Sequence, residues 1–143
     1  MSSEFLEPTY EITFMFKSVL VPFNGKEHAV KALKIALDYA LRYGSRVTVL
    51  YVKRREESDD VANKILEKAK NLAKEKGVEV ELKVKTMKDD ESVAVEIINE
   101  INEGLYDVVI LGSRGKTCSD AILYGSTAVP VALCAPCTVI IVR

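Results

Sequence analysis

The sequence predicts an α/β sandwich, in which helices cover both faces of a parallel β-sheet. Two observations lead to this prediction. Short runs rich in Val, Ile and Leu alternate along the chain with amphipathic segments of helical period. Most of these runs are apolar at every position, which is typical of strands buried on both faces. Parallel strands joined through helices require right-handed crossovers, and 143 residues suit one such domain.

The composition excludes several classes of protein. With 48% hydrophobic and 29% charged residues, the chain is neither disordered, collagen-like nor a disulfide scaffold. A net charge of -1 argues against nonspecific nucleic-acid binding. The three cysteines are an odd number, so they cannot all be paired within the chain, and the first 16 residues contain no basic residue of the kind that begins a signal peptide. These two features predict a reducing, cytoplasmic location. The most apolar stretch, residues 128–142, contains two prolines and is too short to span a bilayer, so no membrane partner is expected.

The first third of the chain predicts strand, helix and strand. An apolar run at residues 19–21 ends at Pro22 and a turn. Apolar residues then recur at helical spacing over residues 29–41, and Gly44 is expected to end this helix. A largely β-branched run at residues 47–52 predicts a second buried strand.

The middle of the chain begins with charge. Residues 53–60 mix both signs, which is typical of a solvated loop, with a flap over a bound ligand as the alternative. An amphipathic helix is expected over residues 61–73, followed by Gly77 as a left-handed cap. Residues 78–84 alternate strictly between apolar and charged, which predicts an edge strand with one face in water.

The last third predicts a further helix and two strands. Residues 92–103 have helical period and lead into an apolar strand at residues 108–111. A short helical region then precedes a terminal strand at residues 138–142. Residues 1–15 have no clear period and form an arm of unclear role, so we place the single domain at residues 16–143.

Ligands of open parallel sheets bind beyond the carboxyl ends of the strands, where the strand order reverses. Three loops are expected there, after residues 19–21, 47–52 and 108–111. The third contains Gly112 and Gly115 in the spacing G-x2-G-x9-G, with a serine after the last glycine. Glycines let backbone amides approach phosphate oxygens, and the third glycine can open a helix whose N-H groups favour an anion. From the residues alone, a phosphate site and ordinary tight turns remain alternatives.

The order of these motifs resembles the universal stress protein family from Lys17 to Arg143. The resemblance rests on KSVLVPFNGKEHA at residues 17–29, the strand at residues 47–52, YDVVILGSRG at residues 106–115, the glycine spacing and APCTVIIVR at residues 135–143. It implies a five-stranded parallel sheet of order 3-2-1-4-5. One subgroup of the family binds ATP, and the terminal strand pairs with its copy in a homodimer.

The resemblance implies an adenine-nucleotide site for ATP. Whether Mg²⁺ or Mn²⁺ accompanies the ATP is left open. By position, the first loop would lie beside adenosine, and the end of the second strand would bind the adenine edge through its backbone. The glycine motif would surround ribose and phosphates. The candidate binding residues are Pro22, Phe23, Asn24, Val52, Gly112, Ser113, Arg114, Gly115, Gly125, Ser126 and Thr127. Two positions depart from the family pattern: Asn24, where ATP-binding members usually have Asp, and Asp120, in a connector where basic residues are common.

Three functions compete at this point. The first is an ATP-binding, stress-linked regulatory module. The second is a nucleotide-free dimeric interaction module, which Asn24 and Asp120 favour. The third is a weak ATPase, limited to slow hydrolysis because the sequence shows no triad, carboxylate pair or metal cluster. We therefore assign no catalytic residue and no metal ligand.

Three other motifs receive structural interpretations. Gly115-Lys116-Thr117 ends like a Walker A loop, but Ile110 stands where that motif requires its first glycine. Cys134 and Cys137 form a C-x-x-C pair after a helix, whose negative end would raise a thiol pKa. We predict buried packing thiols there. His28, the only histidine, is interpreted as a surface residue of the first helix.

Overall fold

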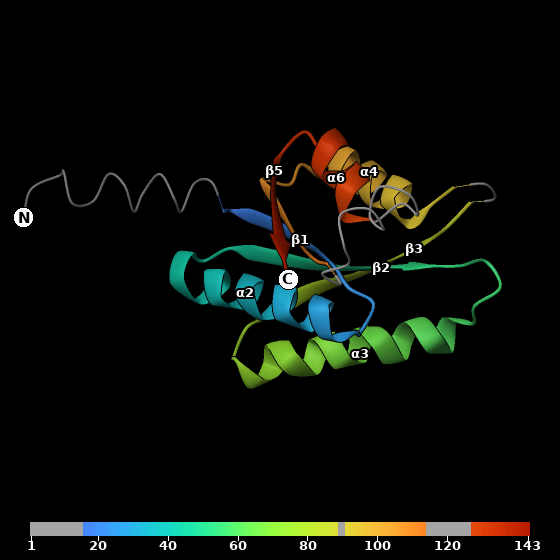
Figure 1. The fold of residues 1–143 in the computed structure, drawn as a ribbon. Helices are drawn as coiled ribbons and strands as arrows, with labels where there is room; N and C mark the ends of the chain where they lie inside the picture. The colour runs from blue at the N-terminus through green and yellow to red at the C-terminus, as the bar shows by residue number, and fades with distance from the viewer. Residues whose placement is uncertain (1–15, 89–90, 114–126) are drawn as a thin grey trace, which may run out of the picture.

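The computed structural model describes residues 16–88, 91–113 and 127–143, in which five parallel strands form one sheet (Figure 1). The strands are β1 (Ser18–Pro22), β2 (Arg46–Lys53), β3 (Val80–Thr86), β4 (Val108–Gly112) and β5 (Thr138–Val142). Their order in the sheet is β3-β2-β1-β4-β5, with every neighbouring pair parallel. The predicted fold class and strand order are confirmed.

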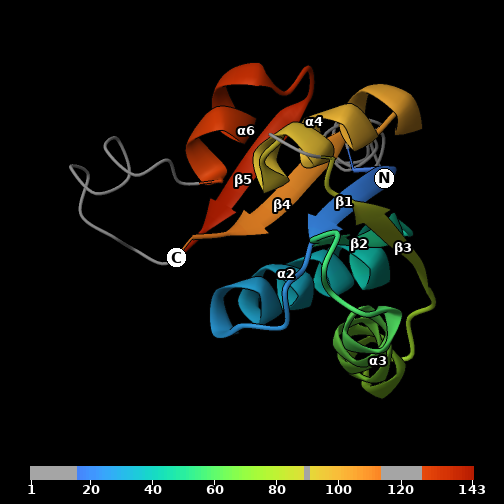
Figure 2. The ribbon, with the colours of Figure 1, turned by 90° about the vertical axis from the view of Figure 1, so that its right-hand side faces the viewer.

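Two layers of helices cover the sheet. The helices are α2 (Glu27–Tyr43), α3 (Asp59–Glu75), α4 (Val93–Gly104) and α6 (Ala128–Cys134). Helices α2 and α3 lie on one face and α4 and α6 on the other, each layer over its own apolar cluster (Figure 2). Over the described ranges, no helix is both long and apolar enough to cross a membrane.

The chain builds the sheet outward from β1 through β2 to β3, then returns to add β4 on the other side of β1. The strand order therefore reverses between β1 and β4. In folds of this kind the crevice at that reversal, beyond the carboxyl ends of the strands, receives the ligand. The topology places the loops after β1, β2 and β4 around this crevice.

The predicted helix stops are confirmed. Gly44 follows α2 with φ +69°, and its N-H donates to the carbonyl of Ala40 at 3.0 Å. Gly77 follows α3 with φ +72°, and its N-H donates to the carbonyl of Lys74 at 3.0 Å. Helix α4 ends at Gly104, and it is the next residue, the non-glycine Leu105, that adopts the left-handed conformation with φ +55°.

Strand β3 is an edge strand, as predicted, and its charged face is partly in water and partly paired with α4. Lys83 Nζ donates to Glu100 Oε2 of α4 at 2.9 Å, and Lys85 Nζ donates to Glu103 Oε2 at 3.1 Å. The side chain of Glu100 is only 2% exposed. The side chains of Lys83 and Lys85 are 42% and 20% exposed, so these lysines form a partly exposed charged layer beside α4 that pairs the charge of the buried Glu100.

Candidate functional site

The backbone of β2 extends past the end of β1 at the strand-order reversal. The N-H of Phe23, just after β1, donates to the carbonyl of Leu50 at 2.8 Å. On the opposite side of β2, the carbonyl of Lys53 accepts the N-H of Met87 at 2.7 Å. Backbone polar groups alternate between the two sides of a strand, so the N-H and carbonyl of Val52 point to the β1 side. Val52 therefore presents its backbone donor and acceptor beside the crevice.

The side chains of Phe23 and Val52 are turned into the core. Phe23 is 3% exposed and packs in the apolar cluster beneath α2 and α3. Val52 packs in the opposite cluster, together with Ala94 of α4 and Met87. Each of these two candidate residues consequently has only its backbone to offer a ligand at this edge.

Two hydrogen bonds and one glycine with positive φ hold the loop after Pro22 in place. Asn24 Oδ1 accepts the N-H of Lys26 at 3.0 Å, and Gly25 adopts φ +81°, which favours glycine. Lys68 Nζ of α3 donates to the carbonyl of Gly25 at 2.7 Å. Because Oδ1 of Asn24 is engaged within the loop, the exposed side chain of Asn24 can offer a ligand its amide N-H donors.

Gly112 joins the end of β4 to the first turn of α2. A Cβ at Gly112 would lie 2.3 Å from the carbonyl oxygen of His28 and 2.8 Å from the nitrogen of Ala29. Only glycine permits this approach. No side chain caps α2 at Lys26, and the first N-H groups of a helix have no acceptor within the helix. The positive end of α2 therefore opens next to Gly112, where an anion would be stabilised.

Two further candidates, Ser113 and Thr127, flank the glycine motif. The N-H of Ser113 donates to the carbonyl of Val142 at 2.8 Å, so this amide extends the β4-β5 ladder. Thr127 precedes α6, and its hydroxyl makes no capping hydrogen bond. The other candidates lie outside the described residues; they are Arg114, Gly115, Gly125 and Ser126. Asp120, which departs from the family pattern, also lies outside them.

The charged run at residues 53–60 is tied back to its own strand. The hydroxyl of Tyr51 donates to Glu57, and Lys53 Nζ lies 3.1 Å from Asp59 Oδ1. Burial, with the hydrogen bond to Glu57, raises the pKa of Tyr51 to about 12. The run is mostly exposed, as expected for a solvated loop. Whether it covers a ligand stays a prediction.

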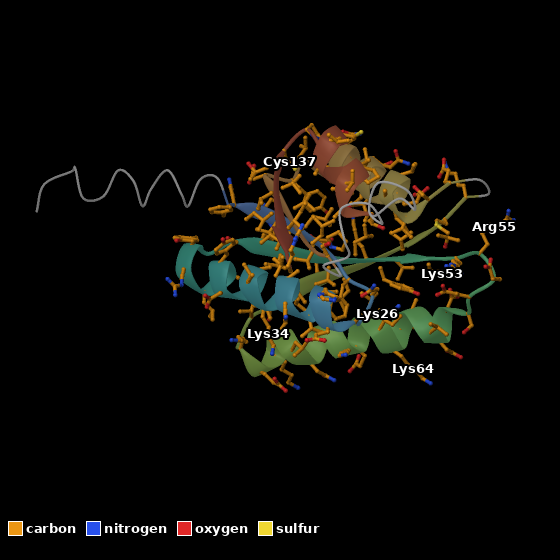
Figure 3. All side chains as sticks on the ribbon, in the orientation of Figure 1. Lys26, Lys34, Lys53, Arg55, Lys64 and Cys137 are labelled. Atoms are coloured by element: carbon orange, nitrogen blue, oxygen red, sulfur yellow. The ribbon has the colours of Figure 1, made fainter. Side chains whose placement is uncertain are left out.

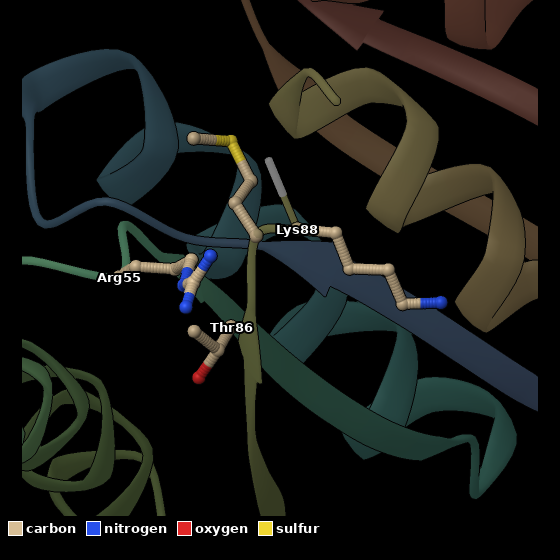
Figure 4. A pocket seen from close by; sticks show the side chains of 4 residues that line it. Arg55, Thr86 and Lys88 are labelled. Carbon is tan, nitrogen blue, oxygen red and sulfur yellow. The ribbon is translucent and has the colours of Figure 1, made fainter. Parts of the chain in front are cut away.

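An open cavity of about 500 Å³ lies beyond the ends of β2 and β3 (Figure 4). It is lined by Arg55, Thr86, Met87 and Lys88. Figure 4 shows the ammonium end of Lys88 pointing away from the guanidinium of Arg55, so their charges do not converge on one point. Sequence reasoning missed this cavity because it depends on the pairing of β2 with β3.

Cationic side chains also mark this end of the molecule. Figure 3 shows Lys26, Lys53 and Arg55 toward the carboxyl ends of the strands, whereas Cys137 lies away from them. Within the described ranges, no group of three or more His, Cys, Asp or Glu side chains could hold a metal ion.

Two interpretations from the sequence need correction. His28 is half-buried, and its Nδ1 atom is buried with no partner among the described residues. Cys134 is exposed, whereas a buried thiol was expected. Burial, with the negative charge of Asp107, raises the pKa of the half-buried Cys137, which suits a packing thiol.

Comparisons with known proteins agree on one family. The sequence profile described as the universal stress protein family matches residues 15–143. Universal stress protein YxiE of Bacillus subtilis is 30% identical over 152 aligned positions, which cover 90% of this chain and all of YxiE.

Solved structures of the same family share the fold. A universal stress protein in complex with cAMP superposes with a TM-score of 0.77 at 19% identity, covering 90% of this chain and 98% of that one. The universal stress protein of Archaeoglobus fulgidus in complex with dAMP gives a TM-score of 0.72 at 21% identity, covering 90% and 99%.

Proposed function

We propose that this chain, which belongs to the universal stress protein family, binds an adenine nucleotide at the reversal of strand order and acts as a stress-linked regulatory module. The observation that carries the proposal is the backbone of Val52. Its N-H and carbonyl lie beside the crevice past the end of β1, as argued above from the hydrogen bonds of Leu50 and Lys53.

The chemistry of this edge suits adenine. The adenine ring presents an acceptor nitrogen next to an amino donor, and a backbone N-H with its neighbouring carbonyl is complementary to that pair. The structurally similar proteins in complex with cAMP and dAMP support the same ligand class. The open start of α2 beside Gly112 supports an anionic ligand.

ATP is our first choice among adenine nucleotides because the glycine motif provides a long stretch for phosphates. Gly115, Gly125 and Ser126 would supply amides to the phosphate chain, with Arg114 as a cation. The described residues offer no ready metal site, so a divalent ion would bind chiefly through the nucleotide phosphates. The odd number of cysteines, which cannot all form disulfides within the chain, supports a cytoplasmic location.

We also propose a homodimer through β5, which is an edge strand. The carbonyl of Val142 points to β4, because it accepts the N-H of Ser113. By the two-residue period, the N-H and carbonyl of Ile141 point away from the sheet. The side chain of Ile141 is 41% exposed. An apolar strand with free polar backbone groups favours pairing with a second copy.

Two measurements on the full chain test nucleotide binding. Mass spectrometry of molecules released from the purified protein is expected to detect an adenine nucleotide. Calorimetric titration with ATP, AMP and cAMP then ranks the ligands. Gly115→Val and Gly125→Val are each expected to abolish binding without unfolding the protein, whereas Ala132→Val, at an exposed position of α6, is expected to bind like the wild type.

Two results would contradict the proposal. Folded Gly115→Val and Gly125→Val variants with wild-type affinity would show that the site is elsewhere. Absence of both released nucleotide and any heat of binding would favour the rival function, a nucleotide-free interaction module.

A further inference from the structure

Two glutamates meet at the start of α4. Glu91 directly precedes Ser92, the N-cap residue, whose hydroxyl accepts the N-H of Val95 at 3.3 Å. Glu96 lies in the first turn, and its N-H donates to the carbonyl of Ser92 at 3.3 Å. The two residues thus lie on either side of the N-cap in the chain.

Both carboxyl groups contain a buried oxygen without a partner. The side chain of Glu96 is 4% exposed, and neither Glu96 Oε1 nor Glu91 Oε2 has a hydrogen-bond partner among the residues that the structure describes. Burying an ionised carboxylate without a donor is costly, and a second carboxylate beside it adds repulsion. A single proton held between the two groups removes both penalties. The protonated carboxyl group is neutral, so the repulsion disappears, and its O-H donates to the remaining carboxylate.

The charged groups around Glu96 do not supply that donor. Apart from the carboxyl group of Glu91, two charges act on Glu96: the positive charges of Lys85 on β3 and of Lys88 after β3. Lys85 is already hydrogen-bonded to Glu103. Helix α6, which also packs on α4, has the sequence AVPVALC and contributes no charged side chain. On β2, Tyr51 packs in the cluster on the opposite face, and Lys53 is paired with Asp59.

The titration behaviour agrees with this geometry. The interaction with the carboxyl group of Glu91, together with burial, raises the pKa of Glu96, although Lys85 and Lys88 act to lower it. The folded protein therefore binds this proton more tightly than an ordinary glutamate does.

We propose that Glu91 and Glu96 share one proton and so form a proton-dependent latch that fastens the start of α4. When the proton leaves for solvent, two carboxylates face each other without a donor. Their repulsion then opposes the position of Glu91 against the first turn, and the cap at Ser92 loosens.

The sign of the pH effect follows from linkage. The folded state binds the proton more tightly than the unfolded state, in which the pKa of a glutamate is about its ordinary value of 4.5. The stabilisation is complete below that value and is lost as pH rises through the folded pKa. Within this window the unfolding equilibrium constant rises by up to about tenfold per pH unit for one proton.

Urea unfolding of the full chain from pH 4.5 to pH 9 tests the latch. In Glu96→Gln or Glu91→Gln, the amide N-H replaces the shared proton as the donor at every pH. Each variant is therefore expected to lose less stability than the wild type between pH 5 and pH 9. The matched control is Glu67→Gln, at an exposed position of α3, which is expected to follow the wild-type profile. Equal pH profiles for the wild type and both glutamine variants would overturn the proposal.

Amide hydrogen exchange gives a second readout that locates the effect and does not require a variant. The protection factors of the Val95 and Glu96 amides, corrected for intrinsic base catalysis, are expected to fall as pH rises in the wild type. They are expected to stay constant in Glu96→Gln. Protection at these amides that does not change with pH in the wild type would overturn the latch even if a variant failed to fold.

A bound cation is the competing explanation for paired carboxylates. The unfolding series is therefore repeated with a chelator and with Mg²⁺, Mn²⁺ or Ca²⁺. No effect of the ions is expected on the difference between the wild type and Glu96→Gln. Ion-dependent stabilisation of the wild type at pH 8 that Glu96→Gln abolishes would show that a metal, not a proton, joins the two groups.

Discussion

The α-carbon of Gly112 packs against the backbone of His28 so closely that a Cβ would lie 2.3 Å from the carbonyl oxygen of His28. This contact joins β4 to the first turn of α2 at the point where the strand order reverses. The sequence suggested that Gly112 serves phosphate binding. The structure shows that glycine is also required there for packing of the protein on itself.

Substitution of Gly112 by alanine is therefore expected to destabilise the protein without any ligand. Because backbone lies on the other side of the contact, Gly112→Ala should lower the free energy of unfolding by about 1 to 3 kcal/mol, as overpacking does elsewhere. Urea denaturation in nucleotide-free buffer measures this. Ser113→Ala is the neighbouring control and should stay within about 0.5 kcal/mol of the wild type. Equal stability of Gly112→Ala and the wild type would refute the close approach.

Most of the fold could be predicted because its signals are local. Runs that are apolar at every position identified the buried strands, and Gly44 and Gly77 identified helix ends. The strand expected at residues 78–84 is found at Val80–Thr86, since alternation fixes the faces of a strand but not its limits. Lys83 and Lys85, on its charged face, pair with Glu100, which is 17 positions from Lys83 in the chain. Such long-range compensation of charge has no local signal.

The candidate site could be predicted only at the level of loops. Parallel topology alone brings the loops after β1, β2 and β4 to one edge. The roles of single groups depend on how far each strand extends. The side chain of Phe23 packs in the core, and the N-H of Ser113 donates to the carbonyl of Val142. No sequence motif predicts either of these contacts. Glu91 and Glu96 were missed because acidic residues at a helix start usually face solvent.

Asn24→Asp is expected to make nucleotide binding more dependent on magnesium. Aspartate keeps the acceptor that Lys26 uses and adds a negative charge beside the expected ribose and phosphates. One charge near a partly exposed divalent ion corresponds to about 1 kcal/mol, or roughly a fivefold change in affinity. Calorimetric titration of ATP into both proteins, with magnesium and with a chelator, measures the difference. Tight binding by both proteins regardless of magnesium would mean that Asn24 is remote from the ion.

Ile141→Pro is expected to convert a β5-mediated dimer into a monomer. The change removes the N-H that points away from β4, while the hydrogen bond between Ser113 and Val142 stays in place. Ile141→Val retains the N-H and a similar side chain, so it serves as the control. Light scattering coupled to gel filtration at micromolar concentration reports the mass. A wild-type monomer, or a dimer that persists in Ile141→Pro, would exclude pairing through β5.

The ion-paired layer beside α4 predicts an acid-dependent loss of stability. Burial alone would raise the pKa of Glu100, but hydrogen bonds from Tyr106 and Lys83, with the charges of Lys83 and Lys85, lower it. A lowered folded pKa stabilises the protein above the ordinary value of 4.5, and this stabilisation is lost as pH falls through the folded pKa. Glu100→Gln should therefore cost about 1.5 to 3 kcal/mol at pH 7, the range for hydrogen bonds to charged groups.

The difference between Glu100→Gln and the wild type should then shrink as the pH falls from 7 toward 3, because the stabilisation by the ionised carboxylate is lost as the pH falls through the lowered pKa of Glu100. Glu103→Gln on the same helix is the control, because its bridge to Lys85 is exposed and should contribute less than about 1 kcal/mol. Urea midpoints of the three proteins at pH 7 and pH 3 provide the comparison. A difference that stays constant between the two pH values would mean that Glu100 acts through its shape and not its charge, since the amide keeps the shape of the carboxylate at either pH.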